Sequence, residues 1–297
     1  MSNNLKTRLI TGFSAAILAI SALVFLESPL MGILVILFSS MACYETCHVA
    51  EMKNKAMIAV AVIVAAALPP LLEYDVFGWL NLPVFLPLLG YFFLLVILML
   101  AGFEKTKFIH MLFALVGSLA VPGAISSVFL VRDMMRENER LWEKNLVIFF
   151  IFYVFCCAWL TDIFAFAVGI NFGKRKLCPK VSPKKTVEGA IGGLVLTAVA
   201  NGGVALMFNR LFLVNHQIKL QMVFAMSFLL SAAAMLGDLT ASVCKRNFGA
   251  KDFGKLFPGH GGVMDRFDSL LFVAPLALGL LQLQYQYGWE LFSEVIG

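Results

Sequence analysis

The sequence has little charge. Asp, Glu, Lys and Arg make up 14% of its 297 residues, whereas 61% are hydrophobic and the mean hydropathy is +0.89. A soluble domain carries about 25% charged and roughly 45–50% apolar residues. This shortage of charge excludes an ordinary soluble fold and indicates a chain whose solvent is lipid.

Cysteine patterns that would indicate disulfides or zinc are also lacking. The six cysteines form no CxxC pair and no His/Cys cluster with zinc-ligand spacing. Four of them lie in or near segments that we assign below to the cytoplasm, a reducing compartment. Because of this cysteine pattern, neither a disulfide framework nor a zinc centre is expected. The chain also lacks a soluble domain, a low-complexity tract and an internal repeat.

Long apolar runs predict an all-α integral membrane protein, a polytopic bundle of about nine transmembrane helices. A spanning helix needs about 20 mainly apolar residues, and the first run is too long for the apolar core of a signal peptide. We divide the chain into N-terminal transmembrane helices (1–145, about five spans) and a C-terminal catalytic region (146–297). The predicted spans are 9–26, 30–44, 56–72, 82–101, 108–131, 146–168, 187–208, 220–241 and 269–288.

The basic residues predict the orientation, because Lys and Arg concentrate on the cytoplasmic side. With the N-terminus inside, 17 of the 23 Lys and Arg residues face the cytoplasm. The tail after Tyr287 then faces outward. The absence of long soluble extensions favours a bacterial inner membrane, with the site facing the cytoplasm.

Two of the predicted cytoplasmic segments, 162–193 and 237–268, differ from the rest of the chain. The first begins with Asp162 inside an apolar run and continues with six Lys/Arg residues, Glu188 and several glycines. The second combines four aspartates, five Lys/Arg residues, six glycines and His260. Cytoplasmic Lys and Arg alone could reflect only topology, but the added acids and glycines favour a functional site.

This mixture predicts a Mg²⁺–polyphosphate site at the membrane surface. Lys and Arg donate to phosphate oxygens, and Gly259, Gly261 and Gly262 let backbone amides approach an anion. Carboxylates repel phosphate unless a cation lies between them, and Mg²⁺ is the usual one. Asp265 and Asp268 are three residues apart, so a helix entering the last span would put both on one face. Asp238 is expected at the same membrane depth.

The residues and their spacings in the two segments resemble the motifs of a known family. The first segment contains Gly173-Lys174 and the run from Ser182 to Gly189, SPKKTVEG. The second contains Ser242, Lys245, Arg246, Lys251, Asp252, His260, Gly261, Gly262, Asp265, Arg266 and Asp268. Together they resemble the signature of the phosphatidate cytidylyltransferase (CDP-diacylglycerol synthase) family. Two positions depart from the family: Cys244 replaces a larger apolar residue, and Ile170 stands where a basic residue often follows Gly169.

The resemblance implies the reaction CTP + phosphatidate → CDP-diacylglycerol + pyrophosphate, dependent on Mg²⁺ and with a monovalent cation such as K⁺ also implied. The metal ligands carried across are Asp238, Asp265 and Asp268, and Lys245 and Arg246 are assigned to catalysis with them. The substrate-binding residues carried across are Ser182, Lys184, Lys185, Ser242, Lys251, His260, Gly261 and Gly262.

Structural alternatives remain for several of these residues. Asp265 could form an ion pair with Arg266 or Lys245, and His260 is more readily a hydrogen-bonding residue than a general base. Asp162 is costly inside a membrane and is therefore a functional candidate, although it could simply pair with a neighbouring helix. Glu45 and Glu51 are interpreted as interfacial charges.

Two other functions remain open. One is a related CTP-dependent enzyme whose acceptor is an isoprenoid ether lipid phosphate or a polyprenol. The other is a transporter of phosphate compounds, although no paired broken helices in two repeated halves support it. The expected partners are CTP and membrane phosphatidate, with no nucleic acid, and a homodimer is one of the open oligomeric states.

Overall fold

The computed structural model describes residues 28–137, 144–214, 216–257, 261–287 and 293–295. The described chain is mostly helical and divides into two compact units. Unit 1 comprises residues 1–126 and 244–267, and unit 2 comprises residues 127–243 and 268–297.

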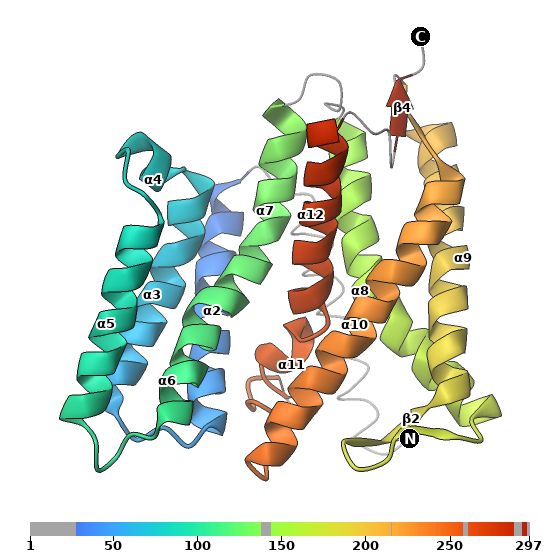
Figure 1. Cartoon of the computed structure of the whole chain (residues 1–297). Helices are drawn as coiled ribbons and strands as arrows, with labels where there is room; N and C mark the ends of the chain where they lie inside the picture. The colour runs from blue at the N-terminus through green and yellow to red at the C-terminus, as the bar shows by residue number, and fades with distance from the viewer. Residues whose placement is uncertain (1–27, 138–143, 215, 258–260, 288–292, 296–297) are drawn as a thin grey trace. The chain divides into compact units, whose positions relative to one another are not determined.

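Unit 1 is a group of apolar helices that lie side by side (Figure 1). Its core is built on α3, where Met57, Ala61 and Ala65 repeat at intervals of four residues and are fully buried. The small alanines let neighbouring helices pack closely against this face. The elements are α2 (Pro29–Val49), α3 (Lys55–Glu73), α4 (Val76–Trp79), α5 (Phe85–Ala101), α6 (Phe108–Leu115), the π-helix η1 (Val116–Ala120), the start of α7 (Val121–Glu137) and the short α11 (Met264–Phe267).

One side chain ties together the loops at one end of unit 1. Asn54 caps α3, because its side-chain oxygen accepts a hydrogen bond from the backbone N–H of Met57. Its amide nitrogen donates to the Leu98 carbonyl and to the Thr106 hydroxyl, both at 3.0 Å. The ends of α3 and α5 and the loop before α6 are thereby held at the same end of the unit.

Unit 2 is organised around α8 and α9. Gly193 permits the close approach of these two helices, because a Cβ atom there would lie 2.9 Å from the Thr161 carbonyl. Thr161 and Thr197 join them by a buried side-chain hydrogen bond of 3.3 Å. The elements are α8 (Lys144–Phe172), β1 (Lys176–Cys178), β2 (Ser182–Thr186), α9 (Val187–Leu211), β3 (His216–Ile218), most of α10 (Leu220–Asn247), α12 (Leu270–Tyr287) and β4 (Ser293–Val295).

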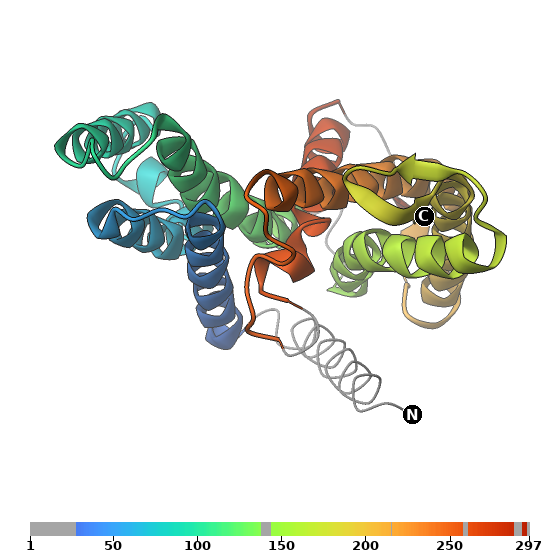
Figure 2. The same cartoon turned by 90° about the horizontal axis from the view of Figure 1, so that it is seen from below.

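Two small antiparallel sheets, which the sequence analysis did not predict, lie in unit 2 outside its long helices. Strands β1 and β2 form a hairpin that packs against α8 and α9 (Figure 2). Strand β3 pairs with β4 in the C-terminal tail. Strand β3 directly precedes α10, so β4 lies beside the start of that helix.

Within the described residues, seven helical segments are long and apolar enough to cross a membrane. They match the second, third and fifth to ninth predicted spans, and the fourth corresponds to the shorter apolar helix α5. The first prediction, 9–26, lies outside the described residues. The chain is a multi-pass membrane protein, and the count of about nine spans is not confirmed.

All six cysteines lie in the described part of the chain and are free thiols. This agrees with the expectation that no disulfide framework is present.

The orientation can be tested by labelling cysteines introduced at Ser182 and Ser293 in a variant that lacks the native cysteines. In intact cells, a membrane-impermeant thiol reagent should label Ser293→Cys and should reach Ser182→Cys only after permeabilisation. The charge bias predicts this difference. Labelling of both sites from one side would contradict the predicted map.

Candidate active site

Four polar side chains from different elements meet in unit 2. The Lys185 ammonium on β2 forms ion pairs with Asp162 on α8, at 3.5 Å, and with Asp238 on α10. The Ser269 hydroxyl, just before α12, donates to the second Asp162 oxygen at 3.1 Å. We call these four residues the lysine–carboxylate cluster. It answers one open question of the sequence analysis: Asp162 pairs with a residue of the basic loop and with the start of the last span.

The local sequence explains how Lys185 is directed into this cluster. Thr186, the next residue, caps α9 by accepting a hydrogen bond from the Gly189 N–H at 3.1 Å. Glu188 in the first turn of α9 accepts backbone hydrogen bonds from Lys174 and Arg175. Both ends of the hairpin are thereby fixed to α9, so the side chain before the cap has a defined direction.

The charges of the cluster support one another. Burial alone would lower the pKa of Lys185, but the Asp162 and Asp238 carboxylates raise it, and the net effect is a pKa above the usual lysine value. The ammonium group therefore remains charged at neutral pH. A cation on a hairpin outside the long helices, held between two carboxylates, can be shared with an incoming phosphate.

Asp268 lies next to this cluster in sequence, but not on the same helix as Asp265. The prediction of one helix carrying both acids is wrong, because α11 ends at Phe267 and α12 begins at Leu270. Asp268 sits in the intervening turn, where its carboxylate accepts a hydrogen bond from the Ser269 N–H at 2.8 Å. Such a local bond competes with helical hydrogen bonding and explains the break.

Asp238 and the turn at residues 268–269 do lie close together within unit 2. Gly237 precedes Asp238, and a Cβ atom at this glycine would be 2.6 Å from the Asp268 carbonyl and 3.1 Å from the Ser269 Cα. The glycine thus lets α10 pack directly against the turn that carries Asp268.

Asp265 is the centre of a second cluster, in unit 1. Its Oδ1 pairs with the Lys245 ammonium at 2.7 Å, and both side chains are buried. Its Oδ2 accepts backbone hydrogen bonds from Phe253 at 2.7 Å and from Gly262 at 2.9 Å. The ion pair that the sequence analysis left as an alternative is therefore present, and Asp265 also organises the loop around it.

Glu45 belongs to the same unit and was missed as a site residue. Instead of an interfacial charge, it is a buried carboxylate with 3% exposure that accepts a hydrogen bond from the Met264 N–H at 2.9 Å. The local sequence gave one signal, an acid within an apolar helix. Its partner lies 219 residues away, so no local pattern could identify the contact.

The remaining predicted site residues are placed less specifically. Lys184, Arg246 and Lys251 are exposed, Ser182 is half-buried on β2, and Ser242 is buried on α10. Arg246 donates to the Ala250 carbonyl at 2.8 Å. Gly261 and Gly262 border Asp265, and His260 lies outside the described residues.

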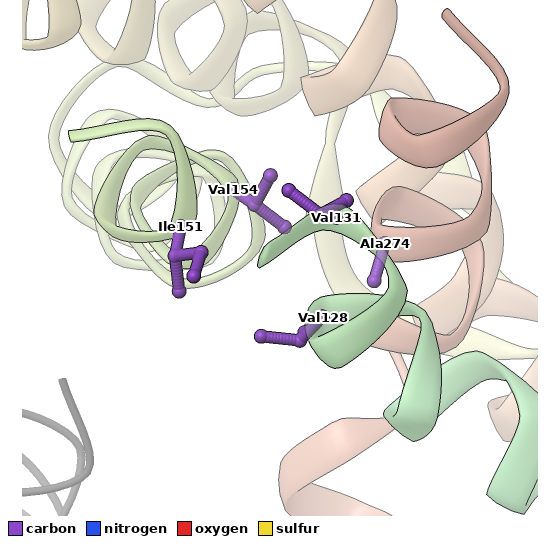
Figure 3. Close-up of a pocket in the computed structure, with 5 residues that line it drawn as sticks. All are labelled: Val128, Val131, Ile151, Val154 and Ala274. Carbon is purple, nitrogen blue, oxygen red and sulfur yellow. The ribbon is translucent and has the colours of Figure 1, made fainter. Parts of the chain in front are cut away.

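Neither of two pockets formed by described residues includes a member of these clusters. The first, in unit 2, is lined only by the aliphatic residues Val128, Val131, Ile151, Val154 and Ala274 (Figure 3). Such a lining offers no chemistry for a charged substrate. The second, in unit 1, is bordered by Lys53, Lys55 and Lys105 at the end held by Asn54.

The side chains present fit a hard cation such as Mg²⁺. In the described ranges, no three His, Cys, Asp or Glu side chains gather as a ready-made metal cage. Mg²⁺ usually does not need one, because one or two carboxylates, substrate phosphates and water complete its shell. The Asp162–Asp238 pair already holds one positive charge, that of Lys185, between its oxygens.

Comparison with known proteins places the chain in a family. A model described as the cytidylyltransferase family matches residues 6–284. The chain belongs to the cytidylyltransferase family. Proteins named phosphatidate cytidylyltransferase from Staphylococcus haemolyticus and Bacillus subtilis are each 43% identical, over 135 and 136 residues. A protein of the same name from Staphylococcus saprophyticus is 44% identical over 135 residues.

These matches cover 46, 45 and 46% of this cytidylyltransferase-family chain, respectively. The chain spans about half the length of the curated relatives it matches, namely 49, 48 and 49% of each. The motif resemblance noted in the sequence thus has the support of a family match along nearly the whole chain.

The buried Lys245–Asp265 pair can be tested by comparing Lys245→Met with Arg246→Met. Methionine keeps a long stem but removes the charge, so Lys245→Met leaves a buried carboxylate without its ion pair. Breaking such a pair costs about 3–5 kcal/mol, whereas an exposed charge such as Arg246 typically contributes less than about 1 kcal/mol. Thermal unfolding of the detergent-extracted protein should show a much larger loss for Lys245→Met. Equal losses would contradict the structural importance of the pair.

Proposed function

We propose that this chain is a phosphatidate cytidylyltransferase that converts CTP and phosphatidate into CDP-diacylglycerol and pyrophosphate. The observation that carries the proposal is the lysine–carboxylate cluster, in which Lys185, on a hairpin outside the long helices, is held between acids on two membrane-spanning helices. A polar nucleotide and a lipid phosphate can meet only at a membrane boundary. The names of the relatives support the same reaction.

The reaction requires no protein nucleophile. An oxygen of the lipid phosphate attacks the α-phosphorus of CTP, the bond from that phosphorus to the bridging oxygen of the β-phosphate breaks, and pyrophosphate leaves with the electron pair. The lipid phosphate is already anionic, because the second pKa of a phosphate monoester is about 6. The chain must align the two phosphates and balance their negative charge.

Basic side chains of the two segments, 162–193 and 237–268, suit this task. In the proposed reaction Lys185, Lys184 and Ser182 bind phosphate groups from the hairpin. In the second segment, phosphate groups are bound by Lys245, Arg246, Lys251, Ser242, His260, Gly261 and Gly262. Lys185 and Lys245 now pair with carboxylates, so each can exchange part of that contact for phosphate without leaving its charge unpaired.

Asp238, Asp265 and Asp268 are the proposed ligands of Mg²⁺. When bound, Mg²⁺ would neutralise phosphate charge and strengthen pyrophosphate as a leaving group. K⁺ as a second cation remains a proposal from the family resemblance. We further propose an inner-membrane location with the site facing the cytoplasm, and a homodimer remains one oligomeric state to test.

The acceptor decides between this enzyme and its close alternatives. Purified protein should incorporate labelled CTP into lipid when given phosphatidate and Mg²⁺. Parallel reactions should contain an isoprenoid ether lipid phosphate or a polyprenol. Preference for either of these acceptors would replace phosphatidate in the proposal, and phosphate flux into vesicles without CTP consumption would favour a transporter.

The basic hairpin should matter more than basic residues elsewhere. Lys184→Ala and Lys185→Ala should each weaken substrate use far more than Lys53→Ala, because only the first two are proposed to hold phosphate. Lys185→Ala should have the larger effect, since it also leaves Asp162 and Asp238 without their shared cation. Steady-state rates at varied CTP and phosphatidate concentrations measure this order. Equal, small effects of all three substitutions would indicate that the basic residues of the hairpin reflect only membrane topology.

The proposed metal ligands can be tested with Asp265→Asn, Asp268→Asn and the double variant. Loss of one key electrostatic group commonly costs on the order of 10²–10³ in rate, and the double variant should be little worse than the worse single one. Initial rates should also depend more steeply on Mg²⁺ concentration.

The Mg²⁺ dependence is the deciding readout for Asp265, because asparagine there also places an amide group against Lys245 or the loop N–H groups. Asp268→Asn also changes a buried side chain that accepts a hydrogen bond from the Ser269 N–H, so its Mg²⁺ dependence is read in the same way. Near-wild-type rates with unchanged Mg²⁺ dependence in folded protein would remove the substituted residue from the metal site.

A further inference from the structure

Glu45 connects two parts of unit 1 that are far apart in the sequence. It lies in the last turns of α2, and its Oε2 accepts a hydrogen bond from the backbone N–H of Met264, the first residue of α11. Within the described residues, its buried Oε1 has no hydrogen-bond partner. A carboxylate is costly to bury in this way, so its position calls for an explanation beyond packing.

Two glycines leave room for this carboxylate. A Cβ atom built at Gly254 or at Gly262 would lie less than 3.0 Å from the Glu45 carboxylate. Any other residue at either position would force the acid or the backbone to move. Gly254 and Gly262 thus both leave space for the Glu45 carboxylate.

The same loop contacts Asp265 from its other side. Phe253, which precedes Gly254, and Gly262 each donate a backbone hydrogen bond to the Asp265 carboxylate. Gly261 has φ +84°, a conformation that favours glycine, and a Cβ there would lie 2.6 Å from Asp265 Oδ2. Residues 253–254 and 261–264, which we call the glycine loop, therefore lie against two carboxylates, Glu45 and Asp265.

We propose that Glu45 is a positioning residue that fixes the glycine loop and α11, and through them the direction of Asp265. Glu45 holds the N–H of Met264, the residue immediately before Asp265, while Gly262 contacts Glu45 and bonds Asp265. A shift of this backbone would move the Asp265 carboxylate relative to Lys245. The role of Asp265 in catalysis rests on the proposed function, whereas the control of its position by Glu45 does not.

The test compares Glu45→Ala and Glu45→Gln with Glu51→Gln, a change at an exposed acid two residues after α2 ends. Hydrogen exchange measured by mass spectrometry on peptides covering 261–267 reports the loop directly. Glu45→Ala should speed exchange there by roughly 10- to 100-fold, the range expected for a lost hydrogen bond to a charged group. Glu45→Gln keeps an oxygen acceptor and should restore most of the protection, and Glu51→Gln should match wild type.

The catalytic readout separates positioning from general stability. In protein that remains folded, Glu45→Ala should lower kcat and raise the Mg²⁺ concentration needed for half-maximal rate, with little change in KM for CTP. Loss of thermal stability alone, with unchanged kcat and Mg²⁺ dependence, would overturn the positioning role. So would wild-type exchange in peptides covering 261–267 of Glu45→Ala.

A double variant tests the predicted steric fit. Gly254→Ala alone should disturb loop exchange, because its methyl group meets the Glu45 carboxylate. In a Glu45→Ala background the same change should add little, and additive effects would contradict the fit. If the wild-type protein shows no CTP-dependent activity, the proposed function fails, while the exchange measurements still decide whether Glu45 holds the loop.

Discussion

The pairing of carboxylates, half-buried in unit 2 and buried in unit 1, with ammonium and backbone N–H groups is the constraint on which both units depend. In a chain so poor in charge, each acid near the lipid carries a desolvation penalty that only nearby donors offset. Lys185 forms ion pairs with Asp162 and Asp238 in unit 2, and Lys245 forms one with Asp265 in unit 1. Gly237, Gly254 and Gly262 allow the close backbone approaches near Asp268 and Glu45.

This constraint also connects structure with the proposed chemistry. A lysine that neutralises two carboxylates is charged, partly desolvated and held in place before any substrate arrives. Phosphate oxygens can then replace carboxylate oxygens around the same ammonium group, so binding requires little new charge separation. Preorganised charge of this kind is what transfer between two phosphates demands, because alignment and electrostatic stabilisation account for most of the catalysis.

Features with a local signature were predictable from the sequence. Apolar runs predicted seven of the long membrane-spanning segments, and the unusual composition of 162–193 and 237–268 identified the segments that carry both clusters. The alternative pairing of Asp265 with Lys245 was also visible, because both residues lie in one short segment.

Features that depend on distant partners were not predictable. Glu45 was interpreted as interfacial because its contacts, Met264 and the glycine loop, lie more than two hundred residues away in the sequence. The helix break at Asp268 depends on a side-chain bond to Ser269 that spacing alone does not reveal. The β1–β2 hairpin contains basic residues typical of a loop, and its pairing depends on the caps that fix it to α9.

The most direct test of the central claim follows the two ends of the CTP triphosphate separately. Purified protein with phosphatidate and Mg²⁺ is given CTP labelled at the α-phosphorus or at the γ-phosphorus. Cytidylyl transfer predicts that the α-label enters the lipid and the γ-label leaves in pyrophosphate. Appearance of the γ-label in lipid would show phosphoryl transfer by a kinase, and the absence of both labels from lipid would contradict the proposed enzyme.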